Sequence, residues 1–494
     1  MKKIIIIGGG IAGLSAGIHA QLYGFESIIY EKHRIVGGQC TGWDRKGYHI
    51  DGCIHWLTGT KEGSDLNRLW HTVGALDNTA IIQLDNFGTY EIDGVTITLW
   101  KDLDRLQADL VKISPEDKEE IIQLIKDIRN VQSMDMPAKM PLDMLPLKDV
   151  FKLIKDMKGA GGVMNRTGKL SCGEYADHFK HPVLRKMLSS TMPNGYSIAA
   201  FIFGMGTFSS GNGAIPTGGS KAMSLRMEQR YLELGGKVIT NMSTVEIMIE
   251  NKNATSVRLQ DGSIIKADYV IAACDTKITF EKLLKGKYTD KKFEMRYHNP
   301  TDYALPTSVQ LAFGVDANLK DYPDTLHFGT EPFLVGATEF HGMGVKNYSF
   351  DTVYAPEGKT LLTVSLNQSD NDYFIWEKLY QDKEKYIAEK QRIADDIKSR
   401  IETHSPELIG KLTLLDVATP MTYHRYTGAY HGAWMSFMMT AKSKSMMHSG
   451  KIKGLKNCYL TGQWLQPPGG LPVAVVTGKF AVQRICKKEK IPYK

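Results

Sequence analysis

The 494-residue sequence lacks the features that mark several large classes of protein. Its cysteines are scattered, with no C-x-x-C pair, which argues against a disulfide framework or a zinc site and fits a reducing compartment. No apolar run resembles a membrane-spanning helix, and no basic cluster interleaved with aromatic residues indicates nucleic-acid binding. We therefore expect a cytoplasmic protein that holds no metal and binds no nucleic acid.

The composition is that of an ordinary globular chain, with 42% apolar and 23% charged residues. A chain of this length is expected to form two or three domains. The net charge of +7 is compatible with attraction to anionic lipid or acidic substrates, although lysines spread this evenly more often only solubilise a surface.

The strongest pattern lies in the first forty residues. Residues 3–7 (KIIII) form a β-branched run typical of a strand that is buried on both faces. A G-x-G-x-x-G pattern follows at residues 8–13, then a helix-compatible stretch over 14–23 and a second strand over 27–30, with Glu31 at its end. This order predicts a βαβ unit that binds a dinucleotide.

The residues of this unit have separate expected roles. Gly8 permits the tight turn, Gly10 lets the backbone approach a pyrophosphate, and Gly13 lets the helix pack close to the strand. Free N–H groups at the helix start hold the phosphates, and Glu31 accepts hydrogen bonds from the adenosine ribose. The predicted binding residues here are Gly8, Gly10, Ile11, Ala12, Gly13, Glu31 and Lys32.

A second glycine pair, Gly37-Gly38, follows the acidic residue, and residues 43–51 (WDRKGYHID) continue with a "GY.ID" strand. Here the sequence resembles the FAD-binding opening of the flavin amine oxidase superfamily. The nearest likeness is to its phytoene desaturase, carotenoid isomerase and retinol saturase branch. The glycine pair offers a second close backbone approach, along the pyrophosphate and ribityl chain of FAD. An arginine often follows this pair in the family, whereas Gln39 stands here.

The resemblance places the loop over residues 51–57 near the flavin ring. His55 is the candidate catalytic residue in this loop, although a lone histidine beside apolar residues is more often a structural group. A later helix–β-meander–strand order, over residues 216–273, resembles the part of the family where the chain returns to the dinucleotide fold. Val245 matches the position whose backbone contacts the adenine.

The closing segment resembles the family's G-[DQ]…P-G-G-G-x-P-x-A run. Gly462 keeps the pattern, and Gln463 replaces the more usual aspartate. In the family the start of the last helix faces the flavin, where backbone donors stabilise negative charge on the reduced ring. We expect Pro472 at the helix entrance, and free N–H groups on Val473 and Ala474. Matching motifs at both termini indicate FAD rather than NAD.

Other segments have two interpretations each. Residues 147–158 (LKDVFKLIKDMK) form a basic amphipathic helix that can lie on a bilayer or can cover a cavity as a lid. Residues 196–208 either line the substrate cavity or pack in a core, and the methionine-rich residues 431–439 suit irregular apolar ligands or cores equally well. We also expect a helix over 114–129 capped by Ser114, and one over 376–401.

Together these features predict an α/β protein with a discontinuous, glutathione-reductase-like, Rossmann-type FAD-binding domain and an α+β substrate domain. The first domain would comprise residues 1–75, 210–290 and 450–494, and the second residues 76–209 and 291–449. The resemblance implies an FAD-dependent oxidoreductase that desaturates, saturates or isomerises carbon–carbon double bonds in an apolar polyene, isoprenoid or lipid. An amine oxidase-type enzyme and a protein with purely structural FAD are the alternatives. Peripheral contact with the inner face of the membrane is a further expectation.

Overall fold

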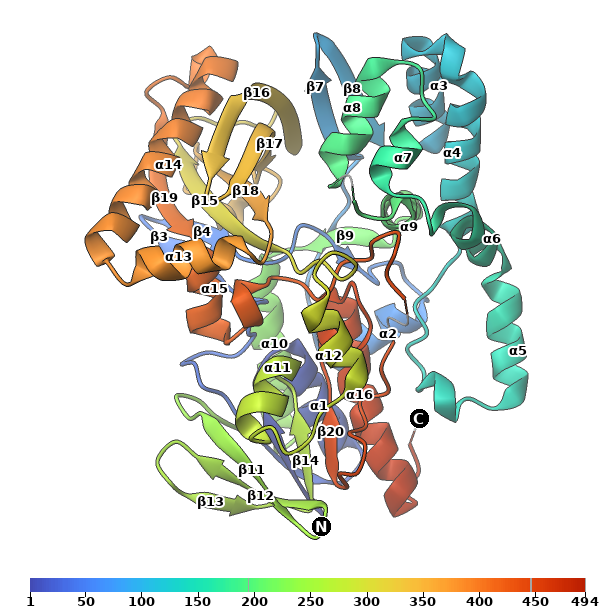
Figure 1. Ribbon diagram of the computed structural model, residues 1–494, viewed down its shortest axis with the longest axis vertical. Coiled ribbons are helices and arrows are strands. Elements are labelled where there is room, and N and C mark those ends of the chain that lie inside the picture. Colours follow the sequence, from blue (N-terminus) through green and yellow to red (C-terminus); the bar gives the residue numbers. More distant parts are fainter. Residues whose placement is uncertain (194, 445–446, 494) are drawn as a thin grey trace.

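The structure, a computed structural model, describes residues 1–193, 195–444 and 447–493 (Figure 1). A parallel sheet with the strand order β10-β2-β1-β14-β20 forms the base of the molecule. Its strands are β10 (Lys237–Ile239), β2 (Glu26–Tyr30), β1 (Lys3–Ile7), β14 (Tyr269–Ala272) and β20 (Cys458–Leu460). Because these strands come from distant parts of the chain, this region is discontinuous in sequence.

The central strand β1 is buried on both faces, as its continuous apolar run predicts. Ile4 and Ile6 pack into a core shared with α1 (Ile11–Leu22), α10 (Gly219–Glu233) and α16 (Gly470–Glu489). Ile5 and Ile7 point the other way, into a core shared with a β-meander. The meander consists of β11 (Thr244–Glu250), β12 (Asn253–Leu259) and β13 (Ile264–Lys266).

Two glycines set how closely the helices approach. A side chain on Gly13 would overlap the carbonyl oxygen of Gly8, so α1 lies directly against the turn that leaves β1. A Cβ on Gly478 would lie 2.5 Å from the Ala12 carbonyl oxygen, and this glycine lets α16 cross α1 at short range. The packing role predicted for Gly13 is therefore confirmed.

The upper part of the molecule contains a seven-stranded sheet with the order β19-β15-β18-β17-β16-β7-β8. The strands are β7 (Asn86–Ile92), β8 (Val95–Trp100), β15 (Thr307–Val315), β16 (Thr325–Val335), β17 (Thr338–Asn347), β18 (Thr360–Gln368) and β19 (Leu412–Ala418). Helices α13 (Asp372–Tyr380) and α14 (Lys383–His404) pack on it around Trp376 and Ile397. Two separate segments of the chain thus build one sheet, joined where β16 pairs in parallel with β7.

A group of helices stands beside this sheet (Figure 1). They are α3 (Leu103–Ile113), α4 (Lys118–Val131), α5 (Leu147–Asp156), α6 (Lys158–Thr167), α7 (Cys172–Ala176), α8 (Pro182–Thr191) and α9 (Ile198–Ser209). Smaller elements complete the chain: β3 (Gly42–Arg45), β4 (Tyr48–Asp51), β5 (Leu57–Thr58), α2 (Asp65–Thr72), β6 (Ile81–Ile82), β9 (Gly213–Pro216), α11 (Thr276–Ile278), α12 (Lys291–His298) and α15 (Pro420–Thr427). Within the described ranges, no helix combines the length and apolarity needed to cross a membrane.

Two predicted helices differ in detail from the structure. Ser114 does not cap a helix: its hydroxyl donates to the Asp117 carboxylate (2.7 Å), a 3-10 turn follows, and α4 begins only at Lys118. The helix expected over 376–401 is two helices, because the chain turns after Tyr380 and Asp382 caps α14 through the N–H of Lys385 (3.2 Å). Local capping chemistry decided both boundaries.

Candidate functional site

A cavity of about 1930 Å³ runs from the parallel sheet up between the upper sheet and the helices. Ligand pockets usually measure about 300–1,000 Å³, so this one has room for a dinucleotide and a second molecule. Most of the predicted site residues line it: Gly8, Gly10, Ile11, Ala12, Glu31, Lys32, Gly37, Gly38, Gln39, His55, Gly462, Gln463, Pro472, Val473 and Ala474. Gly13 and Val245 do not.

The glycine-rich turn has the shape that a pyrophosphate requires. Gly8 adopts a positive φ of 103°, and a Cβ there would lie 2.9 Å from the Ala273 carbonyl oxygen. Gly10 has an ordinary φ of −71°, and a Cβ there would meet only Gly37 and Gly38 backbone atoms, at 3.8 and 4.0 Å. No protein contact therefore explains glycine at position 10. The open space beside it fits a phosphate group of a bound cofactor.

Glu31 is buried at the end of β2 with its carboxylate oriented by the backbone. Its Oε2 accepts the N–H of Gly9 (2.7 Å) and its Oε1 accepts the N–H of His33 (2.7 Å). Each oxygen keeps a second lone pair, so the carboxylate can still accept hydrogen bonds from ribose hydroxyls. Neighbouring Lys32 donates to the Arg425 carbonyl oxygen (3.2 Å), and burial lowers the pKa of its ammonium.

The two glutamines that depart from the family pattern contact each other. Gln463 Nε2 donates to Gln39 Oε1 (3.4 Å), and Gln39 Nε2 donates to the Ala433 carbonyl oxygen (2.6 Å). Gln463 Oε1 in turn accepts the N–H of Gly470 (3.2 Å). In the family that the sequence resembles, an arginine often stands at the position of Gln39 and an aspartate at that of Gln463. This chain has a neutral pair of amides there. The pair joins three loops at the cavity wall without adding charge.

The last helix begins earlier than predicted. Helix α16 starts at Gly470, with Gly469 as N-cap, so Val473 lies in its first turn rather than at its beginning. The N–H groups that α-helical geometry leaves without a partner are those at the very start of the helix. Gly470 uses its N–H on Gln463, and Pro472 has none. Leu471, which also lines the cavity, is therefore a further candidate for a free backbone donor, and the donor roles of Val473 and Ala474 stay predictions.

The structure also places in the cavity wall several residues that sequence reasoning missed. Arg34 lies between Glu31 and the glycine pair, where a cation suits a diphosphate, and its position three residues before that pair is the signal that could have found it. Ser243 and Thr244 line the cavity at the start of β11, whereas the neighbouring Val245 is 43% exposed outside it. The adenine contact proposed for Val245 stays a prediction.

His55 reaches the cavity from the loop after β4. Desolvation and the nearby Lys346 ammonium lower the pKa of its imidazole to about 3, so the ring is neutral at pH 7. Lys346 Nζ donates to the His55 carbonyl oxygen (2.7 Å), and burial lowers the pKa of this lysine to about 8. His55 can therefore accept a hydrogen bond but does not supply a proton as a cation, and its catalytic role stays a prediction.

Asp51 holds the loop that carries His55. Its buried carboxylate accepts the N–H groups of Cys53 (2.8 Å) and Ile54 (3.0 Å) through Oδ1, and the N–H of Ser220 (2.7 Å) through Oδ2. The Ser220 hydroxyl also donates to Oδ1 (2.6 Å). One aspartate thus joins the loop to the start of α10.

The upper arm of the cavity is apolar. One face of α9, which carries Ala200, Phe203, Gly204 and Thr207, lines it, while Ile202 on the other face packs in the core. Cavity lining by this segment, one of its two predicted interpretations, is confirmed for that face. Further apolar lining of the cavity includes Trp56, Met134, Met136, Met157, Ala160, Gly161, Met164, Trp434, Met435, Met439 and Met447. Among the described residues, no cluster of three or more potential ligands is arranged to hold a metal ion.

Comparison with known proteins identifies the family. The sequence model for flavin containing amine oxidoreductases matches residues 11–486. The chain belongs to this family. Its cofactor is FAD, and the predictions of an α/β FAD-binding fold and of an FAD-dependent oxidoreductase are confirmed.

Similar curated proteins fall in the branch named from the sequence. The chain is 23% identical to a 4,4'-diapophytoene desaturase (4,4'-diapolycopene-forming) of Methylomonas sp, over 100% of this chain and 97% of that protein. It is 23% identical to a 4,4'-diaponeurosporene oxygenase of Staphylococcus haemolyticus, over 98% and 97%. It is 22% identical to a chloroplastic prolycopene isomerase of Arabidopsis thaliana, over 97% and 82%.

Solved structures share the fold over nearly the whole chain. An oxidoreductase from Methanosarcina mazei superposes with a TM-score of 0.62 at 17% identity, covering 98% of this chain and 100% of that one. A putrescine oxidase triple mutant gives a TM-score of 0.63 at 14% identity, covering 99% of each chain. At these identities the likeness concerns the fold alone.

Proposed function

We propose that this protein is an FAD-dependent enzyme that desaturates, saturates or isomerises carbon–carbon double bonds in an apolar polyene, isoprenoid or lipid. The observation that carries the proposal is the methionine-rich apolar arm, which is continuous with the dinucleotide half of one cavity. Bound FAD supplies hydride transfer. The protein binds and orients both molecules and excludes water from the space between them.

The side chains of the upper arm suit a long hydrocarbon. Among the residues that the structure describes, seven methionines line the cavity, at positions 134, 136, 157, 164, 435, 439 and 447. Methionine adapts its unbranched, polarizable side chain to irregular apolar shapes. The names of the similar desaturase, oxygenase and isomerase support a polyene substrate for this chain as well.

The acidic residues of the cavity wall argue against a cationic amine substrate. Among the described lining residues, these are Glu31, Asp44, Asp275 and Asp416. Glu31 faces the nucleotide half, Asp44 pairs with Lys221 (3.2 Å), and Asp416 pairs with Arg45 (3.0 Å). Asp275 is buried and accepts the N–H of Tyr430 (2.8 Å), and desolvation raises the pKa of its carboxyl to about 6. Asp44, Asp275 and Asp416 are thus already engaged by protein groups, which disfavours pairing with a substrate ammonium group.

Helix α5 supports a further part of the proposal, that the protein contacts an anionic membrane surface. Its apolar side chains are strongly exposed: Leu147 by 78%, Phe151 by 71% and Ile154 by 63%. Lysines at 148, 152 and 155 accompany them, which is the pattern of a helix that lies in an anionic bilayer surface. The next helix, α6, lines the cavity with Met164 and its neighbours, so this surface adjoins the apolar arm.

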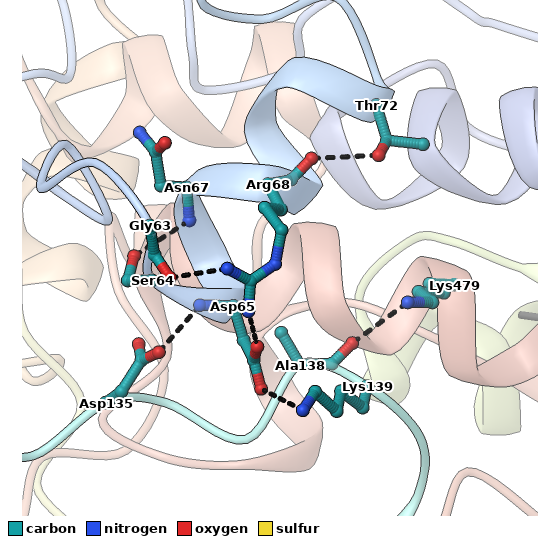
Figure 2. Close-up of polar contacts among 10 residues, drawn as sticks. All are labelled: Gly63, Ser64, Asp65, Asn67, Arg68, Thr72, Asp135, Ala138, Lys139 and Lys479. Atoms are coloured by element: carbon teal, nitrogen blue, oxygen red, sulfur yellow. Dashed lines mark hydrogen bonds and ion pairs between the residues drawn. The ribbon is translucent and has the colours of Figure 1, made fainter.

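The segment before α5 is firmly attached to the nucleotide-binding region, and Figure 2 shows this attachment. Asp135 accepts the N–H of Asp65 at the start of α2 (2.7 Å), and Lys479 of α16 donates to the Ala138 carbonyl oxygen (3.1 Å). Asp143 then forms two hydrogen bonds with Arg484 (2.7 and 2.9 Å). Helix α5 therefore projects from an anchored base rather than from a loose linker (Figure 1).

Anaerobic stopped-flow spectroscopy tests the proposed chemistry. The FAD-loaded protein is mixed with polyenes in detergent, with aliphatic amines, or with neither, and the flavin absorbance is followed. For the oxidised enzyme we expect bleaching by a saturated precursor of a polyene and none by amines. If only the photoreduced enzyme reacts, regaining its absorbance with a polyene, the reaction is a saturation, and product analysis without net flavin change reports isomerisation. Bleaching by amines alone would contradict the proposal, and no reaction in either redox state would favour structural FAD.

A further inference from the structure

Two cysteines in the cavity wall lie opposite each other across a hairpin. Strands β3 and β4 pair in an antiparallel register that joins Gly42 with Asp51. The N–H of Gly52 donates to the Thr41 carbonyl oxygen (2.9 Å), one contact beyond the strands, while the Thr41 N–H turns back to the Gln39 carbonyl oxygen (2.9 Å). The next pair in the same register is Cys40 with Cys53. Both residues line the cavity.

The register brings the two sulfur atoms together. Cys40 and Cys53 are the next opposed positions beyond this contact, and opposed Cα atoms of an antiparallel pair are about 4.5–5.5 Å apart. This falls within the roughly 4.4–6.8 Å that a disulfide spans. Asp44 and His49, an opposed pair farther along the same face, do touch (2.6 Å). The side chains of Cys40 and Cys53 are close enough for Cys53 to influence the ionisation of the Cys40 thiol, raising its pKa.

We propose that Cys40 and Cys53 are a peroxide-responsive thiol pair, which a hydroperoxide oxidises to a cross-strand disulfide in the wall of the flavin cavity. This goes beyond the proposed redox chemistry of the polyene and does not depend on it. The bridge would connect the Gly37-Gly38 turn to the loop that carries His55. It would therefore lock two sides of the cofactor site to each other.

The two cysteines differ in the way that a two-step oxidation requires. Cys53 is half-buried and faces the cavity, so a reagent can reach it. Cys40 is 1% exposed, and its Sγ donates to the Ser220 carbonyl oxygen (3.4 Å). Interaction with the neighbouring Cys53 side chain and burial raise the pKa of the Cys40 thiol well above its usual range. Because Cys53 is the more accessible of the two, it reacts first, and the buried Cys40 is the resolving thiol.

The chemistry balances with the hydroperoxide as the two-electron oxidant. The Cys53 thiolate attacks the peroxide, an S–O bond forms, the O–O bond breaks, and an alcohol or water leaves. The Cys40 sulfur then attacks the sulfenic acid sulfur, an S–S bond forms, the S–O bond breaks, and water leaves with the Cys40 proton. The two thiols lose two electrons and the peroxide gains them.

Thiol counting and peptide mapping test this proposal. The FAD-loaded protein is reduced, desalted and treated with hydrogen peroxide, then denatured in a thiol-blocking reagent and digested without reductant. We expect two of the six thiols to be lost and a peptide pair joined through Cys40 and Cys53, which dithiothreitol releases. Cys172→Ser, a change at a buried cysteine in α7, serves as the matched control and should form the same bridge.

Single variants separate the two steps. In Cys40→Ser, Cys53 should be trapped as a sulfenic acid by dimedone, and in Cys53→Ser, Cys40 should stay a free thiol. Retention of all six thiols by the wild-type protein would overturn the proposal, as would a bridge between any other pair. So would overoxidation of Cys53 beside an unreacted Cys40. Because these three readings use the wild-type chain, they stand even if a variant folds poorly.

Discussion

Replacing Gly10 with valine separates cofactor binding from folding. The backbone at Gly10 has a φ of −71° and a ψ of 179°, which any L-residue adopts without strain. A Cβ there would meet the nearest protein atoms only at ordinary contact distances of 3.8 and 4.0 Å. We therefore expect the apoprotein to fold normally. The added methyl groups, however, would lie in the space that the pyrophosphate fills.

The expected effect on FAD follows from this geometry. Overpacking a tight site typically costs about 1–3 kcal/mol, which is about 5- to 150-fold in affinity. The opposite wall of the slot is backbone of Gly37 and Gly38, which cannot rotate away, so we expect the upper end of that range. The Gly10→Val protein should then purify colourless. In the apoprotein, replacing Gly10 with valine should stabilise the folded state by about 0.4–1 kcal/mol, because the unfolded chain has less freedom. Valine is also a weaker N-cap for α1 than glycine, and this loss offsets the gain by a similar amount.

The assay compares flavin absorbance with thermal unfolding. Saturating FAD at 1,000 times its dissociation constant would stabilise the wild-type protein by about 4.1 kcal/mol, and the variant should lose most of this gain while its apo midpoint stays close to wild type. Gly13→Val is the contrasting control, because its side chain would overlap the Gly8 carbonyl and should destabilise the apoprotein itself. A yellow Gly10→Val protein with full flavin content would refute the N-terminal binding site.

Three further predictions concern the rest of the site. Leu471→Pro removes a backbone donor from the first turn of α16, where proline is tolerated. We expect the variant to retain FAD and to have a lower flavin midpoint potential, since losing such a donor costs about 2.7–4 kcal/mol where charge develops. An unchanged potential would mean that this turn does not face the flavin. Ile154→Asp on α5 should weaken binding to anionic liposomes, measured by flotation, by about tenfold or more. Ile409→Asp is the control and should not weaken it, because the Ile409 side chain is as exposed (64%) as that of Ile154 (63%). Equal flotation of both variants would favour the lid interpretation. His55→Gln should leave the shape of the pH–rate profile between pH 5 and 8 unchanged, because the pKa of His55 is about 3 and its ring is already neutral over that range. If the variant instead loses an ionisation near neutral pH from its profile, the histidine titrates during catalysis.

Local sequence determined the parts of this protein whose interactions are short in sequence. The β1–turn–α1–β2 unit, the buried Glu31 and the closing strand all depend on patterns within about thirty residues, such as a continuous apolar run or a glycine that only a tight turn requires. Those patterns predicted the cofactor, and most of the residues that they singled out line the cavity. They missed the start of α16 because the glycines at 469 and 470 read as a loop, yet both have positive φ values at the beginning of the helix.

Tertiary structure alone decided which of these residues meet. Gln39 and Gln463 are 424 positions apart and contact each other, and Lys346 lies 291 positions from the His55 carbonyl that it binds. No local periodicity encodes such a pairing, because each partner satisfies its own strand or loop without reference to the other. The same holds for α5: its sequence shows an apolar face, but only the packing of the whole chain shows that nothing in the described structure buries it.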